Sequence, residues 1–405
     1  MIVLSGADVV LPDRVLSPGT LVLEGDRVVE VASGERPAHS GARHFNLRGH
    51  SIVPGFIDVH VHGVHGTDVM EGDDGVRTVA DHLPRYGVTA FCPTTIACSP
   101  AALRRTLAAV RTARTSVSSG GARVLPAHLE SNFLNPDFRG AQPLECLRVP
   151  RAGSDEGAFT GAEILDEIAA ARPDVGIVTV ASELDGAVQL IRDLVAHGHY
   201  VSLGHSGASY DEALAGIDAG ARQATHLFNR MAPLGHRAPG LAGAVLERED
   251  VVAELICDLV HVHPSMVHLA VSAKGPSGVM AITDGTAGSG LPRGSHAVLG
   301  GTRITVGDAA YLDDGTIAGS VLTMDRAFAR LVTTMGLSLI DAATMCSTTP
   351  ARALRLQGFG VIAPGQVADL VVLDRELVVV HTFIDGALAW SGESPASSWK
   401  LGAGS

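Results

Sequence analysis

The 405-residue sequence contains very little lysine, and this scarcity bears on its partners. Only Lys274 and Lys400 occur, so arginine carries almost all of the positive charge. The 30 basic residues stand against 43 acidic ones, which gives a formal net charge of −13. Proteins that bind nucleic acids usually present a basic stripe, and this sequence has none. We therefore expect no nucleic-acid partner.

Cysteine is scarce too, and long apolar runs are missing. The five cysteines are scattered and form no C-x-x-C pair, which argues against a disulfide framework or a cysteine zinc site and fits a reducing cytosol. No uncharged apolar stretch reaches the roughly 18 residues that suggest a membrane span. The first residues also lack the basic region of a signal peptide. We expect a cytoplasmic protein without a membrane partner.

Helical periodicity is missing from both ends of the chain. Residues 1–50 contain short β-rich pieces punctuated by proline and glycine, and residues 369–390 have the same texture. Two β-rich ends around a long middle predict one small β-sandwich domain, formed by residues 1–50 together with residues 361–405.

The middle of the chain, residues 51–360, alternates between strand-like and helix-like segments, which predicts the α/β class. Eight candidate strands can be counted: Phe56–Val61, Thr89–Pro93, Arg123–Leu129, Ile177–Ala181, Tyr200–Leu203, Gln223–Leu227, Ala253–Cys257 and Val279–Thr283. Amphipathic segments between them include Pro100–Ser116, Ala162–Arg172, Leu184–His197, Asp211–Ala219 and Met266–Lys274. Strands joined by helical crossovers pair in parallel, so this pattern predicts a (β/α)8 TIM barrel. The alternative, a doubly wound sheet, lacks its glycine-rich phosphate loop, and a repeat array lacks a fixed period.

The ends of the predicted strands carry the chemically useful side chains. In a barrel of this kind the active site forms where the carboxyl ends of the strands meet. The residues at or just beyond those ends are His60, His62, Glu130, His205, His226, His261 and Asp284. The segment Leu134–Gly157 has no periodicity, and we expect it to form a loop over this mouth of the barrel.

A metal site is the interpretation that these residues favour. His60 and His62 alternate along one strand, so both imidazoles point to the same face. Taken alone, the H-x-H spacing is a weak signal for a metal site, because a hydrogen-bonded pair of histidines at a strand end also explains it. Together with Glu130, His205 and His226 they offer the nitrogen and oxygen donors that suit Zn²⁺.

Asp284 and Glu130 have further expected roles in such a site. Asp284 is expected to act as a general base, and the alternative is a carboxylate that caps the next helix. Neither lysine falls at a strand end, which excludes a carbamylated lysine as a bridge between two metal ions. If any side chain bridges two ions, we expect it to be Glu130.

Eight motifs occur in the order found in a known family. They are PGFIDVHVHG (54–63), HLE (128–130), LGHS (203–206), THLFN (225–229), HRAPG (236–240), ITDG (282–285), GTIAGS (315–320) and GVIAPGQVADLVVLD (360–374). On these motifs nearly the whole chain resembles the amidohydrolase superfamily and, within it, the N-acetylglucosamine-6-phosphate deacetylase family. The resemblance implies hydrolysis of N-acetylglucosamine-6-phosphate to glucosamine-6-phosphate and acetate. It also implies a divalent metal, Zn²⁺, with one or two ions per chain.

The resemblance further implies a role for each matching residue. Glu130, His205 and His226 would hold the main metal ion, His60 and His62 would hold a second, and Asp284 would be the catalytic base and acid. The substrate-binding residues would be Gln142, Asn229, Arg230, Arg237, His261, Ile317, Ala318 and Gly319. The implied assembly is a homodimer in which Arg237 reaches the phosphate of the neighbouring subunit.

Several positions near the expected sugar pocket depart from the family pattern. Ser131 and Asn132 replace Gly–Pro after HLE, Gln142 replaces a histidine, and Arg230 replaces an alanine. These departures keep open the same chemistry on another N-acyl amino sugar, such as N-acetylgalactosamine-6-phosphate. A different amidohydrolase, acting on an N-acyl amino acid or a cyclic amide, would leave the implied phosphate-binding residues without a role. A non-enzymatic barrel would show gaps in the ligand set, and the sequence shows none.

Overall fold

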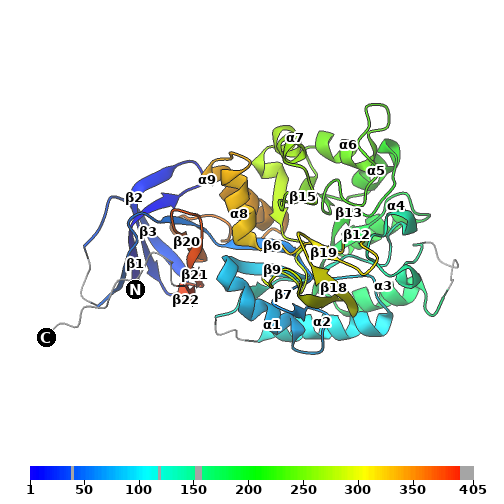
Figure 1. Cartoon of the computed structure of the whole chain (residues 1–405), viewed down its shortest axis with the longest axis horizontal. Coiled ribbons are helices and arrows are strands. Elements are labelled where there is room, and N and C mark those ends of the chain that lie inside the picture. Colours follow the sequence, from blue (N-terminus) through cyan, green and yellow to red (C-terminus); the bar gives the residue numbers. More distant parts are fainter. Residues whose placement is uncertain (38–40, 117–119, 151–156, 393–405) are drawn as a thin grey trace.

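The computed structural model describes residues 1–37, 41–116, 120–150 and 157–392 and has two parts (Figure 1). Strands from both ends of the chain gather at one side, and a parallel barrel with surrounding helices forms the other. This arrangement confirms the predicted (β/α)8 barrel with a β-structure built from both termini. Among the described helices, none combines the length and the apolar character that a membrane crossing needs.

The β-structure from the two ends is one connected sheet. Its strands are β1 (Ile2–Val10), β2 (Val15–Glu24), β3 (Arg27–Ser33), β4 (Arg43–Asn46), β5 (Ser51–Pro54), β20 (Leu370–Leu373), β21 (Val379–Ile384) and β22 (Ala387–Ser391). One edge of β1 pairs first with β4 and then with β5, so the sheet divides there. Phe45 on β4 and Phe383 on β21 meet edge to face, with ring centroids 5.5 Å apart. The domain boundaries at residues 50 and 360 stay a prediction, and residues 393–405 lie outside the described part.

All eight predicted barrel strands are present. They are β6 (Phe56–Val61), β9 (Val88–Thr95), β10 (Arg123–Val124) with β11 (Ala127–Leu129), β12 (Val175–Val180), β13 (Tyr200–Leu203), β14 (Gln223–Ala224), β15 (Val252–Ile256) and β16 (Val279–Ile282). The third strand is divided next to Pro126, which has no N–H to donate to a neighbouring strand. β6 and β16 close the barrel through bonds from His62 N to Gly285 O (2.8 Å) and from Asp284 N to His60 O (3.0 Å).

Helices follow the strands around the barrel. The five predicted amphipathic segments form α2 (Pro100–Thr115), α3 (Gly161–Ala170), α4 (Ala187–Ala196), α5 (Tyr210–Asp218) and α7 (Pro264–Lys274). The other α-helices of the described residues are α1 (Gly75–His82), α6 (Gly240–Glu247), α8 (Met324–Thr333), α9 (Leu339–Ala343) and α10 (Thr349–Ala353), and a π-helical turn, Thr344–Thr348, joins the last two. Thr160 and Ser209 begin α3 and α5 with capping boxes, in which side chains satisfy the free backbone N–H groups of the first turn.

Three smaller features lie at the mouth of the barrel or beside it. The hairpin β7 (Gly63–Val64) and β8 (Thr67–Asp68) follows the first barrel strand, and the antiparallel sheet β17 (His296–Leu299), β18 (Thr302–Val306) and β19 (Ala310–Tyr311) follows the last. Neither was predicted from the sequence. Within the predicted loop Leu134–Gly157, the described part contains the 3₁₀ turns Pro136–Phe138 and Leu144–Cys146, whereas residues 151–156 lie outside the described residues.

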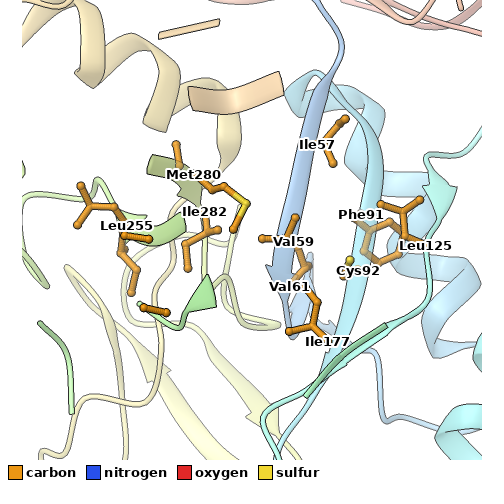
Figure 2. Packing of buried hydrophobic residues seen from close by; sticks show 14 of the residues in the cluster. Ile57, Val59, Val61, Phe91, Cys92, Leu125, Ile177, Leu255, Met280 and Ile282 are labelled. Carbon is orange, nitrogen blue, oxygen red and sulfur yellow. The ribbon is translucent and has the colours of Figure 1, made fainter. Parts of the chain in front are cut away.

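The barrel strands present an apolar and a polar face. Ile57, Val59 and Val61 on β6 belong to the buried apolar cluster of the barrel (Figure 2). The alternating residues Asp58 and His60 are equally buried but form hydrogen bonds with other polar side chains. Because side chains alternate along a strand, one strand supplies both the hydrophobic packing and the polar groups that lead to the mouth.

Phe56 begins β6 and generates a stability prediction. Its ring is fully buried and stacks on Phe328 of α8, with ring centroids 5.2 Å apart. Phe56→Ala leaves a cavity, so we expect the free energy of unfolding to fall by about 3–5 kcal/mol, measured by urea denaturation. Leu144→Ala, at a side chain that is 53% exposed, is the control and should cost less than about 0.5 kcal/mol. Equal losses in the two variants would contradict the packing argument.

Candidate active site

Three of the predicted ligands meet at the mouth of the barrel, each from the end of a different strand. The Nε2 atoms of His205 and His226 lie 2.6 Å and 2.9 Å from Oε1 of Glu130. The two Nε2 atoms are 3.0 Å apart, and all three side chains are buried. This group of donor atoms is close enough to hold one metal ion.

His60 and His62 form a second group beside the first, together with Asp284. Their Nε2 atoms are 3.2 Å apart and lie 3.3 Å and 3.1 Å from Oδ1 of Asp284. Oε2 of Glu130 lies 3.6 Å from Nε2 of His62. Glu130 therefore faces both groups, with Oε1 toward His205 and His226 and Oε2 toward His62.

Unusual backbone angles direct three of these side chains into the mouth. The φ angle is +48° at His205, +30° at His226 and +49° at Asp284. Residues other than glycine rarely adopt such angles, and each instance costs on the order of 1–3 kcal/mol. All three residues come just after the last residue of a strand, so the turn redirects the chain where a side chain is needed.

Hydrogen bonds on the far side of two rings determine which nitrogen carries the proton. Nδ1 of His62 lies 3.1 Å from the carbonyl oxygen of Thr94, and Nδ1 of His205 lies 2.9 Å from that of Phe138. A carbonyl oxygen only accepts hydrogen bonds, so both rings carry a proton on Nδ1. When neutral, each ring presents the lone pair of Nε2 to the mouth.

Lone pairs and carboxylates therefore converge on one small volume. At the 2.6 Å between Nε2 of His205 and Oε1 of Glu130, two acceptors repel each other unless a positive charge neutralises them. Imidazole nitrogen and carboxylate oxygen are the donors that Zn²⁺ and similar divalent ions prefer. The residues present thus fit a divalent metal.

The pKa values of the cluster reflect the same demand for positive charge, because the carboxylates favour protonated rings at His62 and His226. Burial lowers the pKa values of His62 and His226, but hydrogen bonds and charge from Asp284 and Glu130 outweigh burial and raise both values to about 9. Burial dominates at His60 and lowers its pKa to about 3. Burial also opposes ionisation of Asp284, but the His60 and His62 rings outweigh it and hold the pKa of Asp284 below its usual value. Asp284 is therefore ionised and able to accept a proton.

Four of the five predicted ligands, His62, Glu130, His205 and His226, line a cavity of about 520 Å³ together with Asp284, whereas His60 lies behind it. Most of the predicted substrate-binding residues line the same cavity. Those residues are Gln142, Asn229, Arg230, His261, Ile317 and Gly319. Ala318 is 1% exposed and packs in a small apolar cluster with Ile304 instead. Arg237 lies on an exposed loop and does not line the cavity of its own chain.

Two basic side chains in the cavity are suited to an anionic group. Nδ1 of His261 lies 2.6 Å from Oδ2 of Asp258, and Nε2 of His261 is buried without a hydrogen-bond partner among the described residues. Within the described part of the chain, the one hydrogen bond of the Arg230 guanidinium is a long one, 3.4 Å to the carbonyl oxygen of Ile317. Asp258 thus orients His261 so that its free nitrogen is available to a ligand.

Gln142 contacts the protein with both ends of its amide. Its Nε2 donates a hydrogen bond to Oε2 of Glu130, and its Oε1 accepts one from the backbone N of Ala97 at 2.7 Å. The amide therefore positions Glu130, and its predicted contact with the substrate stays a prediction.

Ser131 and Asn132 support the loop behind the site and do not line the cavity. Oγ of Ser131 donates to the carbonyl oxygen of Thr179 at 2.5 Å. Nδ2 of Asn132 donates to the carbonyl oxygens of Cys98 and Cys146 at 2.8 Å and 2.7 Å. These two departures from the family pattern act on the loop, whereas those at Gln142 and Arg230 face the cavity.

Sequence reasoning missed one polar residue of the site. Glu254 lies in β15 and is fully buried, and its Oε2 is 2.9 Å from Nδ1 of His60. The available signal was a lone carboxylate inside the otherwise apolar stretch Val251–Cys257. Burying such a group without a partner is costly, so its presence alone points to a specific contact.

Removal of the Glu130 charge tests the metal site. Glu130 contacts both groups of donors, so we expect Glu130→Gln to bind less than about half an equivalent of Zn²⁺ per chain, whereas the wild type binds at least one. Metal analysis after dialysis against Zn²⁺ measures the difference. Glu249→Gln, at an exposed position, is the control. Full metal content in Glu130→Gln would show that the ion lies elsewhere.

Comparison with known proteins agrees with the fold and the site. The amidohydrolase family model matches residues 51–389. N-acetylglucosamine-6-phosphate deacetylase of Bacillus subtilis is 34% identical over 371 residues, covering 90% of this chain and 91% of the relative. N-acetylgalactosamine-6-phosphate deacetylase of Escherichia coli O157:H7 is 34% identical over 340 residues, covering 84% and 87%. The structure of a mutant N-acetyl-D-glucosamine-6-phosphate deacetylase of Mycobacterium smegmatis, in complex with N-acetyl-D-glucosamine-6-phosphate, has a TM-score of 0.85 at 33% identity, covering 96% of this chain and 99% of that one. The chain therefore belongs to the amidohydrolase family and, within it, groups with the amino-sugar-6-phosphate deacetylases.

Proposed function

We propose that the protein is a metal-dependent deacetylase that hydrolyses N-acetylglucosamine-6-phosphate to glucosamine-6-phosphate and acetate. The observation that carries the proposal is one cavity that combines a cluster of metal donors, an ionised carboxylate and two basic side chains suited to a phosphate. The relatives described above are named for this activity or for the same reaction on N-acetylgalactosamine-6-phosphate.

The proposed cofactor is Zn²⁺, with one or two ions per chain. Glu130, His205 and His226 would hold the first ion, and His60 and His62 would hold a second beside it. A bound divalent ion supplies Lewis acidity, which polarises the acetyl carbonyl and lowers the pKa of a water molecule.

Asp284 is proposed to move the proton that the reaction requires. Its carboxylate accepts a proton from the attacking water, and it returns that proton to the amine nitrogen as the C–N bond breaks. The bond that forms joins the water oxygen to the acetyl carbon, so acetate and the free amine leave. Oδ1 of Asp284 lies 3.3 Å and 3.1 Å from Nε2 of His60 and His62, so the carboxylate stands beside the proposed position of the second ion.

The phosphate is proposed to bind at the other polar part of the cavity. His261, when protonated, directs Nε2–H into the cavity because Asp258 occupies Nδ1. Arg230 and Asn229 line the same cavity, and a guanidinium pairs well with phosphate oxygens. The sugar would then lie between this end and the metal donors, beside Ile317 and Gly319.

A homodimer is proposed to complete the phosphate site with Arg237 of the neighbouring subunit. Arg237 lies outside the cavity of its own chain, on the loop that follows β14. The exposed apolar side chains Leu234, Leu259 and Val260 lie on this loop and on the loop after the adjacent strand β15. Exposed apolar side chains near a functional loop favour a contact between subunits there.

N-acetylgalactosamine-6-phosphate is the second candidate substrate. The Escherichia coli O157:H7 relative is named for that sugar and is as similar to this chain as the Bacillus subtilis relative. Gln142 and Arg230 face the cavity and depart from the family pattern, so the selection between the two sugars is expected to depend on them.

An amine-release assay in the presence of Zn²⁺ tests the proposal on three substrates. They are N-acetylglucosamine-6-phosphate, N-acetylgalactosamine-6-phosphate and unphosphorylated N-acetylglucosamine. Two hydrogen bonds to a charged group contribute about 3–6 kcal/mol, so we expect kcat/KM for a phosphorylated sugar to exceed that for the third substrate by at least about 100-fold. The control is Arg237→Ala, which should raise KM for phosphorylated sugars only. Failure of the metal-loaded protein to turn over any of the three would contradict the proposal.

Asp284→Asn tests the proton transfer separately from binding. Asparagine keeps the shape of the side chain but cannot accept the proton, so we expect kcat to fall by about 10²–10⁴-fold with little change in metal content. Steady-state kinetics and metal analysis measure the two effects. Asp137→Asn, at another carboxylate that lines the cavity, should leave kcat nearly unchanged. A fully active Asp284→Asn enzyme would assign the base to another residue.

A further inference from the structure

Glu254 lies below the metal donors, inside the barrel, where the proposed reaction does not use it. It comes from the middle of β15 (Val252–Ile256), and its side chain is fully buried. Its Oε2 lies 2.9 Å from Nδ1 of His60, and the backbone N of His226 donates to the same oxygen at 3.4 Å. Glu254 therefore contacts one ligand of each proposed ion from behind.

The contact with His60 sets the state of that ring. A carboxylate that accepts a hydrogen bond from Nδ1 keeps the proton on that nitrogen, which leaves the lone pair on Nε2. Nε2 of His60 is the atom that lies 3.2 Å from Nε2 of His62 and 3.3 Å from Asp284. The carboxyl group of Glu254 thus has the position that carboxylates commonly occupy behind metal-binding histidines.

Direct coordination by Glu254 is the competing explanation, since His60, His128 and Glu254 lie close enough to hold an ion among themselves. Both ring nitrogens of His128 already have partners. Nδ1 lies 3.0 Å from the carbonyl oxygen of Val59, and Nε2 lies 2.8 Å from Oγ1 of Thr179. Nδ1 of His60 would also have to give up its proton. The contacts therefore favour a role through His60 over a separate ion.

A purely structural role is the other alternative. Asp58 offers a comparison, because it is a second fully buried carboxyl group in the same part of the barrel. Asp58 accepts a hydrogen bond from Oγ1 of Thr283 at 2.6 Å and touches His60 only at the backbone N, at 3.3 Å. Glu254, in contrast, bonds to the ring of His60. Comparing variants at Glu254 and Asp58 therefore distinguishes the general effect of removing a buried carboxyl group from a specific effect on the His60 ring.

We propose that Glu254 is a positioning residue that holds the Nδ1 proton of His60 and thereby prepares Nε2 of His60 for the second of two divalent ions. This inference rests on the proposed metal dependence. The ion held by Glu130, His205 and His226 does not need His60. Loss of Glu254 is therefore expected to lower the affinity for the second ion and to leave the affinity for the first ion unchanged.

Zinc binding by the full-length protein tests this assignment without any activity measurement. The metal-free protein is dialysed against buffered Zn²⁺ over a range of free concentrations, and bound zinc per chain is measured. We expect two ions for the wild type. Glu254→Gln keeps an acceptor oxygen, and we expect the affinity for the second ion to fall by about 10-fold. Glu254→Leu offers no acceptor, so the affinity for that ion should fall by about 100-fold or more. Both variants should bind the first ion as the wild type does.

Asp58→Asn is the matched control, because it removes a buried carboxylate that does not bond to the ring. It should bind two ions. The proposal is overturned if Glu254→Leu binds the second ion with wild-type affinity, if Asp58→Asn loses it equally, or if the wild type binds a single ion. If Glu254→Leu does not fold, unchanged zinc affinity in Glu254→Gln also overturns it. None of these results alters the substrate assay, so failure of this inference is distinguishable from failure of the proposed function.

Discussion

An excess of hydrogen-bond acceptors at one point is the constraint on which the rest of the site depends. Carbonyl oxygens behind His62 and His205 hold one proton of each ring on the far side, so a neutral ring turns a lone pair toward the carboxylates of Glu130 and Asp284. Such an arrangement is unfavourable until positive charge enters, either as a second proton on a ring or as a bound cation. The fold must therefore hold the donors rigidly enough that they cannot turn away. It does so with strand ends, left-handed turns and hydrogen bonds behind the rings.

Closure of the barrel places the first and the last strand in direct contact at the site. The backbone bonds between His60 and Asp284 and between His62 and Gly285 join these strands where their side chains meet. The residues proposed for metal binding, His60 and His62, and the residue proposed for proton transfer, Asp284, therefore lie on two neighbouring segments that backbone hydrogen bonds join. Strand alternation adds a second benefit, because the apolar residues of β6 pack in the barrel core while His60 faces polar partners. Stability and chemistry thus use opposite faces of the same strand.

Much of this could be predicted from the sequence, because it depends on local patterns. Strand and helix periodicity gave the barrel, the spacing of His60 and His62 gave their common direction, and the position of Asp284 after a strand placed it at the mouth. Other features depend on register between distant segments. The contact of Glu254 with His60 joins two strands far apart in the chain, and the bond of Gln142 to Glu130 depends on how a loop without periodicity folds back. Contacts of this kind are decided by tertiary packing, which a single sequence does not display. The β17–β18 hairpin is different, because Gly300–Gly301 forms its two-residue turn and is a local hairpin signal that the sequence analysis did not use.

The pairing of β5 with β20 has a consequence for the order in which the molecule is made. β5 leads through one glycine into β6, the strand that carries His60 and His62, and its neighbour β20 comes from the far end of the chain. During synthesis β5 and β6 emerge early, whereas β20 emerges only after all eight barrel strands. Contacts between segments so far apart form slowly, because a long loop must close first. The sheet beside the first barrel strand can therefore be completed only after all eight barrel strands have been made.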